Sequence, residues 1–279
     1  PAGLEAARVL GEPGHDVVLF EAAPRLGGQV LLGAGASWRN DLSGVINWRA
    51  GELDRLGVDV RTSRYAERED VLAEDPEIVI VATGGVPDID WLEGVEHVTG
   101  AWDFLTKIGP AGEQVLVYDG TGRHPALQCA ERATAAGAEV HLVCIDGEIA
   151  TELTYAERAI WKQKIYEAGV KMTQDHRLLN IAKSGNRLKA TFANEATGAT
   201  VELPADRVVV EHGTIPVDDI YQALRGDSVN NGVTDLNALL AGRPQSQGKG
   251  FELHRIGDAV SSRNIAAAVY DALRLCHVM

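Results

Sequence analysis

Hydrophobic and polar positions divide the chain into alternating helical and extended segments. Residues 1–10 carry small and apolar side chains at helical spacing, and residues 16–21 form a hydrophobic run that is closed by an acid. An amphipathic segment follows at 42–56, and a second short apolar run comes directly after it at 57–60. Helices that alternate with short apolar runs predict βαβ units and a mostly parallel sheet.

Three further apolar runs have the pattern of buried parallel strands that are each followed by a tight loop. They cover residues 77–82, 114–119 and 206–211. A fourth run at 251–256 precedes a helix that the spacing predicts from 265 to 275. We expect this last strand to return to the first sheet.

An internal repeat gives the strongest evidence for the fold. Aligning Gly3 with Ala126 brings Gly14 onto Gly137 and Glu21 onto Cys144, so helix, turn and strand lengths repeat without a gap. A repeat of this kind indicates two stacked nucleotide-binding units.

The predicted fold class is therefore α/β, with two nested three-layer dinucleotide-binding domains that are Rossmann-like. Residues 1–110 and 205–279 are expected to form a discontinuous first domain, and residues 111–204 are expected to form a second domain inserted within it. Within the insertion, alternation between residues 177 and 203 predicts an antiparallel meander.

The first residues have the sequence of the back half of a dinucleotide-binding turn. A complete fingerprint is a strand, then G-x-G-x-x-G, then a helix, and only its third glycine, Gly3, is found here. We therefore expect an N-terminally truncated fragment whose first strand is missing. Such a fragment should be poorly stable on its own and should bind nucleotide weakly.

Composition limits the partners more than the fold. The 279 residues are 45% hydrophobic and carry a formal charge of −14, which repels nucleic acid and anionic membrane surfaces. The three cysteines show no C-x-x-C spacing, and the sequence contains neither a signal peptide nor a membrane-length apolar run. These features favour a cytoplasmic protein with buried structural thiols and without an iron–sulfur cluster of its own.

Five motifs, in this order, carry a resemblance to a known family; they are Pro1–Ala7, Glu21 followed by Gly27–Gln29, Val81–Gly85, Val115–Asp119 and Arg255–Ala259. With them, almost the whole chain resembles the two-domain dinucleotide-binding flavoproteins. Within these it looks closest to the C-terminal half of the trimethylamine dehydrogenase and 2,4-dienoyl-CoA reductase family, which includes NADH:flavin oxidoreductases and demethylases of small N-methylated amines.

The resemblance implies that substrate chemistry takes place outside this chain. In such proteins an N-terminal TIM barrel carries FMN and a 4Fe–4S cluster, and the region seen here carries FAD or ADP, with NAD(P)H on the second domain in reductase members. The resemblance thus implies FAD or ADP binding in the first domain and an NAD(P)-binding-like second domain. Two hypotheses follow for this oxidoreductase fragment. It either relays electrons between NAD(P)H, FAD and the missing barrel, or it is a non-redox ADP-binding module whose barrel passes electrons to a separate carrier protein. We assign no catalytic residue and no metal ligand.

Several residues of the first site have candidate roles toward the adenine dinucleotide. Gly3 is expected where the first helix meets the pyrophosphate, unless it serves helix packing alone. Glu21 is expected to accept hydrogen bonds from the adenosine ribose, unless it is only an exposed acid at a strand end. Arg25 either meets a phosphate oxygen or is a solvated surface arginine.

The loops that follow supply the remaining candidates for the first site. Gly28 allows a close turn against the cofactor, and Gln29 either contacts the cofactor or is a polar loop residue. Thr83 and Gly84 are expected to border the adenine or pyrophosphate.

The connection after the last predicted strand supplies two more candidate cofactor-binding residues. Gly257 is expected to free a backbone amide at a helix start, and Asp258 is expected to accept from a ribityl hydroxyl of FAD. If the ligand is ADP, Asp258 serves as a helix N-cap instead.

The second site departs from the usual fingerprint. Gly120 and Gly122 begin a G-x-G-x-x-x-A turn that is one residue too long, and Pro125 crowds it. Cys144 replaces the ribose-binding acid, for which Asp146 is a substitute. The sequence leaves open whether this domain binds NAD(P)H or is a vestigial scaffold.

Overall fold

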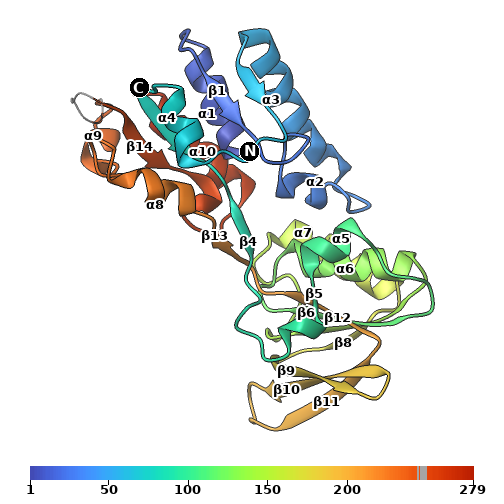
Figure 1. Cartoon of the computed structure of the whole chain (residues 1–279). Helices are drawn as coiled ribbons and strands as arrows, with labels where there is room; N and C mark the ends of the chain where they lie inside the picture. The colour runs from blue at the N-terminus through green and yellow to red at the C-terminus, as the bar shows by residue number, and fades with distance from the viewer. Residues whose placement is uncertain (244, 246–249) are drawn as a thin grey trace. The chain divides into compact units, whose positions relative to one another are not determined.

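The computed structural model describes residues 1–243, 245 and 250–279 (Figure 1). It divides the chain into two compact units, each built from separate stretches of sequence. Unit 1 consists of residues 1–31, 41–86 and 215–279, and unit 2 consists of residues 32–40 and 87–214. The predicted α/β class is confirmed, because helices alternate with parallel strands in both units.

Unit 1 holds its strands in two parallel pairs. β1 (Val18–Phe20) pairs with β2 (Asp59–Arg61), and β14 (Glu252–Arg255) pairs with β3 (Ile78–Val81). The prediction that the last strand returns to the first unit is therefore confirmed. The helices of unit 1 are α1 (Ala2–Gly11), α3 (Ser43–Leu56), α4 (Arg68–Ala73), α8 (Asp219–Arg225), α9 (Leu236–Leu240) and α10 (Ile265–Cys276), with the 3₁₀ turn η3 (Gly257–Ala259). Helix α2 (Gln29–Gly33) and the 3₁₀ turn η1 (Asn40–Leu42) lie where the chain passes from unit 1 to residues 32–40 of unit 2 and back.

Helix α1 lies at the centre of unit 1 because apolar side chains cover two of its faces. One face packs Ala2, Ala6 and Val9 against α10, where small residues allow the two helices to approach closely. The other face packs Leu4 and Ala7 against α3. The start of α1 is thereby fixed against the loops that follow β1, β3 and β14.

Unit 2 is a three-layer sandwich around a five-stranded parallel sheet (Figure 1). The strand order is β5 (Thr99–Gly100), β12 (Arg207–Glu211), β6 (Gln114–Asp119), β7 (Glu139–Cys144) and β8 (Lys171–Thr173). One face carries α5 (Ala101–Thr106), α6 (His124–Ala135) and α7 (Tyr155–Glu167). The other face carries the predicted meander of β9 (His176–Ser184), β10 (Arg187–Asn194) and β11 (Thr200–Ala205).

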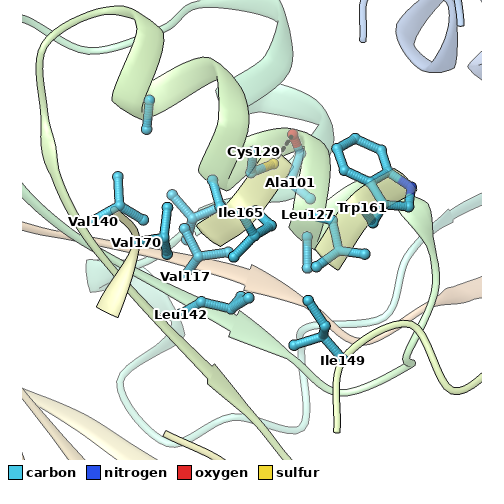
Figure 2. Packing of buried hydrophobic residues seen from close by; sticks show 14 of the residues in the cluster. Ala101, Val117, Leu127, Cys129, Val140, Leu142, Ile149, Trp161, Ile165 and Val170 are labelled. Atoms are coloured by element: carbon cyan, nitrogen blue, oxygen red, sulfur yellow. Dashed lines mark hydrogen bonds between the residues drawn. The ribbon is translucent and has the colours of Figure 1, made fainter. Parts of the chain in front are cut away.

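The core between the sheet and its helices is closely packed (Figure 2). Val117 and Leu142 of the sheet are fully buried beneath Leu127 of α6 and Trp161 of α7. Cys129 is also buried here, and its thiol donates to the carbonyl of Ala101 at 3.6 Å. All three cysteines are buried and free, which confirms the predicted structural thiols.

The chain enters and leaves the larger segment of unit 2 through two paired strands, β4 (Gly85–Pro87) and β13 (Thr214–Pro216). A 3₁₀ turn, η2 (Val95–His97), follows β4. Residues 87–110 and 205–214, which we expected in the first domain, lie in unit 2 because β5 and β12 extend its sheet.

The sequence repeat has a direct structural counterpart. Gly14 and Gly137 follow α1 and α6 with φ values of 97° and 87°, a left-handed conformation that favours glycine. Each glycine turns the chain from its helix toward β1 or β7. In the parts of the chain that the structure describes, no helix is long and apolar enough to span a membrane.

Candidate nucleotide sites

The first candidate site lies at the start of α1. The amides of the first helical turn have no carbonyl partner within the helix, and the helix dipole makes this end attractive to anions. A Cβ atom at Gly3 would lie 3.3 Å from the Cβ of Ala82, so helix and strand end are already in close contact. This is the packing that the third glycine of the fingerprint serves.

Glu21 directly follows β1 and has one carboxylate oxygen available. Its Oε1 accepts a hydrogen bond from the amide of Ala23 at 2.9 Å, which fixes the side chain at the strand end. Its Oε2 makes no hydrogen bond in the described part of the chain. The carboxylate is thus oriented and still able to accept from a ribose hydroxyl.

Charges from three distant segments surround the start of α1. Arg49, Glu21 and Asp258 each lie within electrostatic range of the Pro1 nitrogen, which directly precedes α1. These three side chains therefore lie around the same helix end. The fold brings together two acids that the sequence singled out and one arginine that it did not.

The β14–α10 connection touches this end directly. Gly257 has a φ of 63°, and a Cβ atom there would lie 2.8 Å from the Cβ of Ala2. Its amide donates to Asp271 at 3.0 Å, so the expectation that this amide is free is wrong. The expectation that Asp258 caps the following helix is also wrong, because Asn264 caps α10 while Asp258 accepts from the amide of Arg263.

The loop after β1 contains the candidate residues Arg25, Gly28 and Gln29, and its residues Arg25 and Gly28 are exposed. Arg25 is exposed and makes no hydrogen bond or ion pair in the described part of the chain. Gly28 has a φ of 54°, and a Cβ atom there would meet no atom within 4 Å. Gln29 begins α2. A Cβ atom at the neighbouring Gly27 would lie 2.8 Å from Leu31 Cγ, so Gly27 is the glycine that packing requires.

Thr83 and Gly84 follow β3 and belong to the same unit. The hydroxyl of Thr83 donates to the carbonyl of Val217, whose amide in turn donates to the carbonyl of Gly84 at 3.0 Å. These hydrogen bonds connect the segment after β3 to the segment after β13. A ligand would meet Gly84 through its open, glycine-only conformation, with a φ of 78°.

At the second candidate site, which lies at the end of β6, the side chain of Asp119 binds the backbone amides of the turn. Asp119 is fully buried, and its Oδ1 accepts from the amides of Thr121 at 3.0 Å and Gly122 at 2.9 Å. The other oxygen, Oδ2, is buried without a hydrogen-bond partner. The amides that a pyrophosphate would need are therefore already used by a carboxylate.

A neighbouring segment also closes the turn. A Cβ atom at Gly122 would lie 2.1 Å from Thr151 Oγ1 and 2.9 Å from Asp146 Oδ2. These two atoms form a hydrogen bond of 2.5 Å with each other. At Gly120 a Cβ atom would lie 2.8 Å from the ring of His212. Asp146, the proposed substitute for the ribose acid, thus packs over the turn.

A second buried carboxyl lies beside Asp119 in the sheet. Glu211 of β12 is the register partner of Asp119 and is 6% exposed. Burial raises the pKa of Glu211 to about 8, and the charge of Asp119 contributes to the increase. Burial likewise raises the pKa of Asp119 to about 6. Neither acid was among the site residues predicted from the sequence, although an aspartate at a strand end before glycines, as Asp119 is, is a typical turn former.

Comparison with known proteins identifies the class to which this fold belongs. Residues 1–237 match the family described as pyridine nucleotide-disulphide oxidoreductase, and the chain belongs to that family. Its structure also superposes on a thioredoxin reductase from Lactococcus lactis with a TM-score of 0.70, covering 99% of this chain and 93% of that one at 18% identity. The family is one of FAD- and NAD(P)-binding proteins, as expected.

Relatives within this class agree with the resemblance seen in the sequence. The chain is 46% identical to a multifunctional alkene reductase/demethylase from Caballeronia cordobensis and 43% identical to a probable N-methylproline demethylase from Rhizobium meliloti. Each alignment covers 99% of this chain but only 42% and 41% of the relative. A histamine dehydrogenase from Rhizobium sp. 4-9 has a TM-score of 0.83 at 24% identity, over 99% of this chain and 42% of that one. The chain thus spans about two fifths of the proteins it resembles.

Proposed function

We propose that unit 1 holds an adenine nucleotide, FAD or ADP, within the nucleotide-binding region of a longer flavin-dependent demethylase or reductase. Support comes from the open amides at the start of α1, the free oxygen of Glu21 and the close packing of Gly3. The demethylase and reductase names of the relatives support the class of the whole protein. The proposal includes a barrel domain that carries FMN and a 4Fe–4S cluster, as the family resemblance implies.

The residues of unit 1 have distinct tasks toward this nucleotide. The first turn of α1 binds the pyrophosphate through backbone amides, and Glu21 orients the ribose. Arg25 is free to neutralise a phosphate oxygen from the loop after β1. If the nucleotide is FAD, it would supply electron transfer, Gly28 would allow a close turn against it, and Asp258 would accept from a ribityl hydroxyl; if it is ADP, Asp258 would only stabilise its own loop through the amide of Arg263.

We further propose that unit 2 does not load NAD(P)H. The observation that carries this proposal is that Asp119 accepts from both amides of the second turn, whereas among the residues that the structure describes no side chain accepts from the amides at the start of α1. A pyrophosphate would bring two negative charges against the buried carboxylate of Asp119, whose pKa of about 6 leaves it mainly ionised at neutral pH. Electrons therefore leave the barrel for a separate carrier protein rather than enter through unit 2. The three free thiols support a reducing cytoplasm as the location.

The test is to produce the longer protein, to identify the nucleotide that it releases on denaturation, and then to titrate it with NADH and NADPH. Release of FAD or ADP, together with no saturable NADH or NADPH binding, is the expected result. Absence of any adenine nucleotide, with no binding of added ADP or FAD, would overturn the role of unit 1. Saturable binding of NADPH that is lost in Gly122→Val would overturn the role of unit 2.

A further inference from the structure

We propose that Arg49, which lies outside the fingerprint, is a phosphate-binding residue of the unit 1 site and that Glu5 holds it in place. The inference rests on the proposed function, because it names a further residue for the same nucleotide. Arg49 lies on α3, and Glu5 lies in the first turn of α1. The packing of these two helices brings the guanidinium to the helix end where the pyrophosphate binds.

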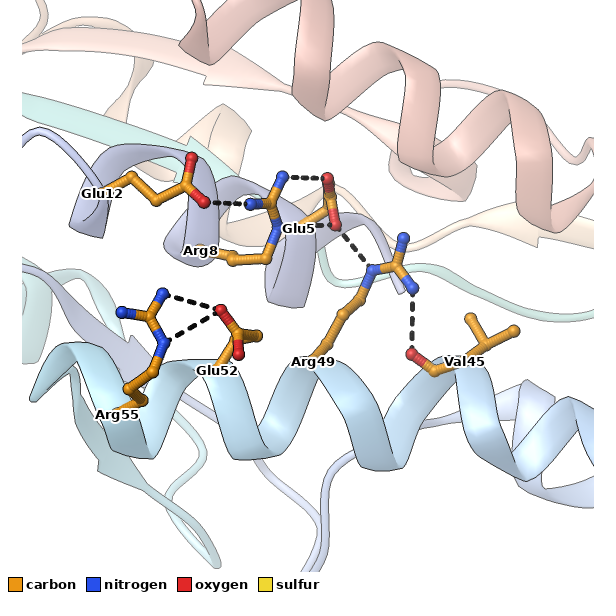
Figure 3. Close-up of polar contacts among 7 residues, drawn as sticks. All are labelled: Glu5, Arg8, Glu12, Val45, Arg49, Glu52 and Arg55. Carbon is orange, nitrogen blue, oxygen red and sulfur yellow. Dashed lines mark hydrogen bonds and ion pairs between the residues drawn. The ribbon is translucent and has the colours of Figure 1, made fainter.

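Glu5 is a buried carboxylate shared by two arginines (Figure 3). Its Oε2 accepts from Arg49 Nε at 2.7 Å, and its Oε1 accepts from Arg8 Nη2 at 2.7 Å. Burial acts to raise the pKa of Glu5, but the two arginines hold this pKa below its usual value. Glu5 is therefore a fixed anion that orients both guanidinium groups.

Arg49 has one donor group left over. Its Nε is used by Glu5, and its Nη1 donates to the carbonyl of Val45 at 2.9 Å. Its Nη2 makes no hydrogen bond in the part of the chain that the structure describes. The Arg49 side chain is only 12% exposed, so a charged group with unused donors is held at the edge of the site. A phosphate oxygen is the partner that a pre-oriented guanidinium suits.

The direction of the guanidinium separates Arg49 from Arg8. The charge of Arg49 acts on the nitrogen of Pro1, whereas Arg8 lies farther along α1 and also pairs with Glu12 at 2.7 Å. In other respects the two arginines are matched. Both side chains are 12% exposed, both bind Glu5, and both guanidinium groups lie over the ring of Trp48, at 5.3 and 5.4 Å.

This match supplies the control for the experiment. Arg49→Met and Arg8→Met each remove one ion pair from Glu5, and Arg8→Met also removes the pair with Glu12, so Arg8→Met is expected to lower the melting temperature of the full chain at least as much as Arg49→Met. Calorimetric titration with ADP and with adenosine then separates binding from stability. Arg49→Met should weaken ADP binding about tenfold to a hundredfold, as expected for a lost hydrogen bond to a charged group, and should leave adenosine binding unchanged. Arg8→Met should bind both ligands as the wild type does.

Two outcomes would overturn the inference. Equal ADP affinity in Arg49→Met, Arg8→Met and wild type would show that Arg49 only joins α1 to α3. An equal loss for ADP and adenosine would place the effect on the fold rather than on phosphate. Arg49→Lys retains a cation beside Glu5 and serves if the methionine variant fails to fold; it should lose ADP affinity but not adenosine affinity. If the wild type of the longer protein bound neither ADP nor adenosine, that result would refute the proposed function itself, and the role of Arg49 with it.

Discussion

Replacing Asp119 with asparagine should stabilise unit 2 at alkaline pH and have little effect at acidic pH. The asparagine Oδ1 can still accept from the amides of Thr121 and Gly122, so the shape of the turn is retained. The change removes a negative charge that is fully buried and whose Oδ2 has no hydrogen-bond partner. It also removes the charge that acts on Glu211.

The magnitude follows from the protonation of the carboxyl group. Its pKa in the folded chain is about 6, against an ordinary value of 3.8, and burial is the main cause. Because the folded pKa is the higher one, the folded state binds the proton more tightly, and the stability from this group is present below pH 3.8 and is lost as the pH rises through 6. At about 1.4 kcal/mol per pKa unit, the buried charge costs about 3 kcal/mol at pH 8.

The assay is urea denaturation of the full chain at pH 5 and pH 8, followed by tryptophan fluorescence. Four of the five tryptophans, at positions 38, 91, 102 and 161, lie in unit 2, so the signal reports mainly on this unit. Asp119→Asn should have the higher free energy of unfolding at pH 8, and the difference from wild type should shrink at pH 5. Asp146→Asn removes a nearby but partly exposed charge and should show a smaller pH dependence.

The reasoning about Asp119 would be refuted by a variant that is less stable than wild type by the same amount at both pH values. That result would mean that the ionised carboxylate is a net stabilising cap, with its burial fully offset by the turn amides.

Two glycine substitutions test the packing around the turns and helices. Gly51→Ala, in the middle of α3 with open space around its Cβ position, should raise the free energy of unfolding by about 0.5–1 kcal/mol, measured by urea denaturation; a loss of stability would contradict the exposed helical position. Gly122→Ala should destabilise unit 2 by about 1–3 kcal/mol in the fluorescence assay, because its Cβ would overlap Thr151 and its φ of 62° is unfavourable for alanine. Unchanged stability in that variant would show that the segment carrying Thr151 is not packed against the turn.

Much of the architecture was predictable because it depends on local periodicity. The repeat that aligned Gly14 with Gly137 corresponds to two helix-to-strand turns of like conformation. The alternation between residues 177 and 203 became the meander of β9, β10 and β11 because every second side chain is needed for one face of the sheet. Patterns of this kind survive folding because burial selects them directly.

The features that decide the chemistry were not predictable, because they depend on side-chain direction and on contacts distant in sequence. Nothing in the order of residues shows that Asp119 turns back onto the amides of Thr121 and Gly122. The pair formed by Glu5 and Arg49 joins residues 44 positions apart and exists only once α1 packs on α3. Such contacts follow from the three-dimensional structure and not from spacing.

The short segment at residues 32–40 has a consequence for dividing this protein into parts. It belongs to unit 2, although unit 1 sequence lies on both sides of it, and its backbone carbonyls accept from the buried Gln128 at 2.6 Å and from Arg132 at 2.9 Å. A clone cut at residues 87 and 214 would leave the side chains of Gln128 and Arg132 without these two acceptors. Unit 2 is therefore encoded by two separate stretches of the gene. Recombination that transferred only the stretch for residues 87–214 would produce a domain without residues 32–40.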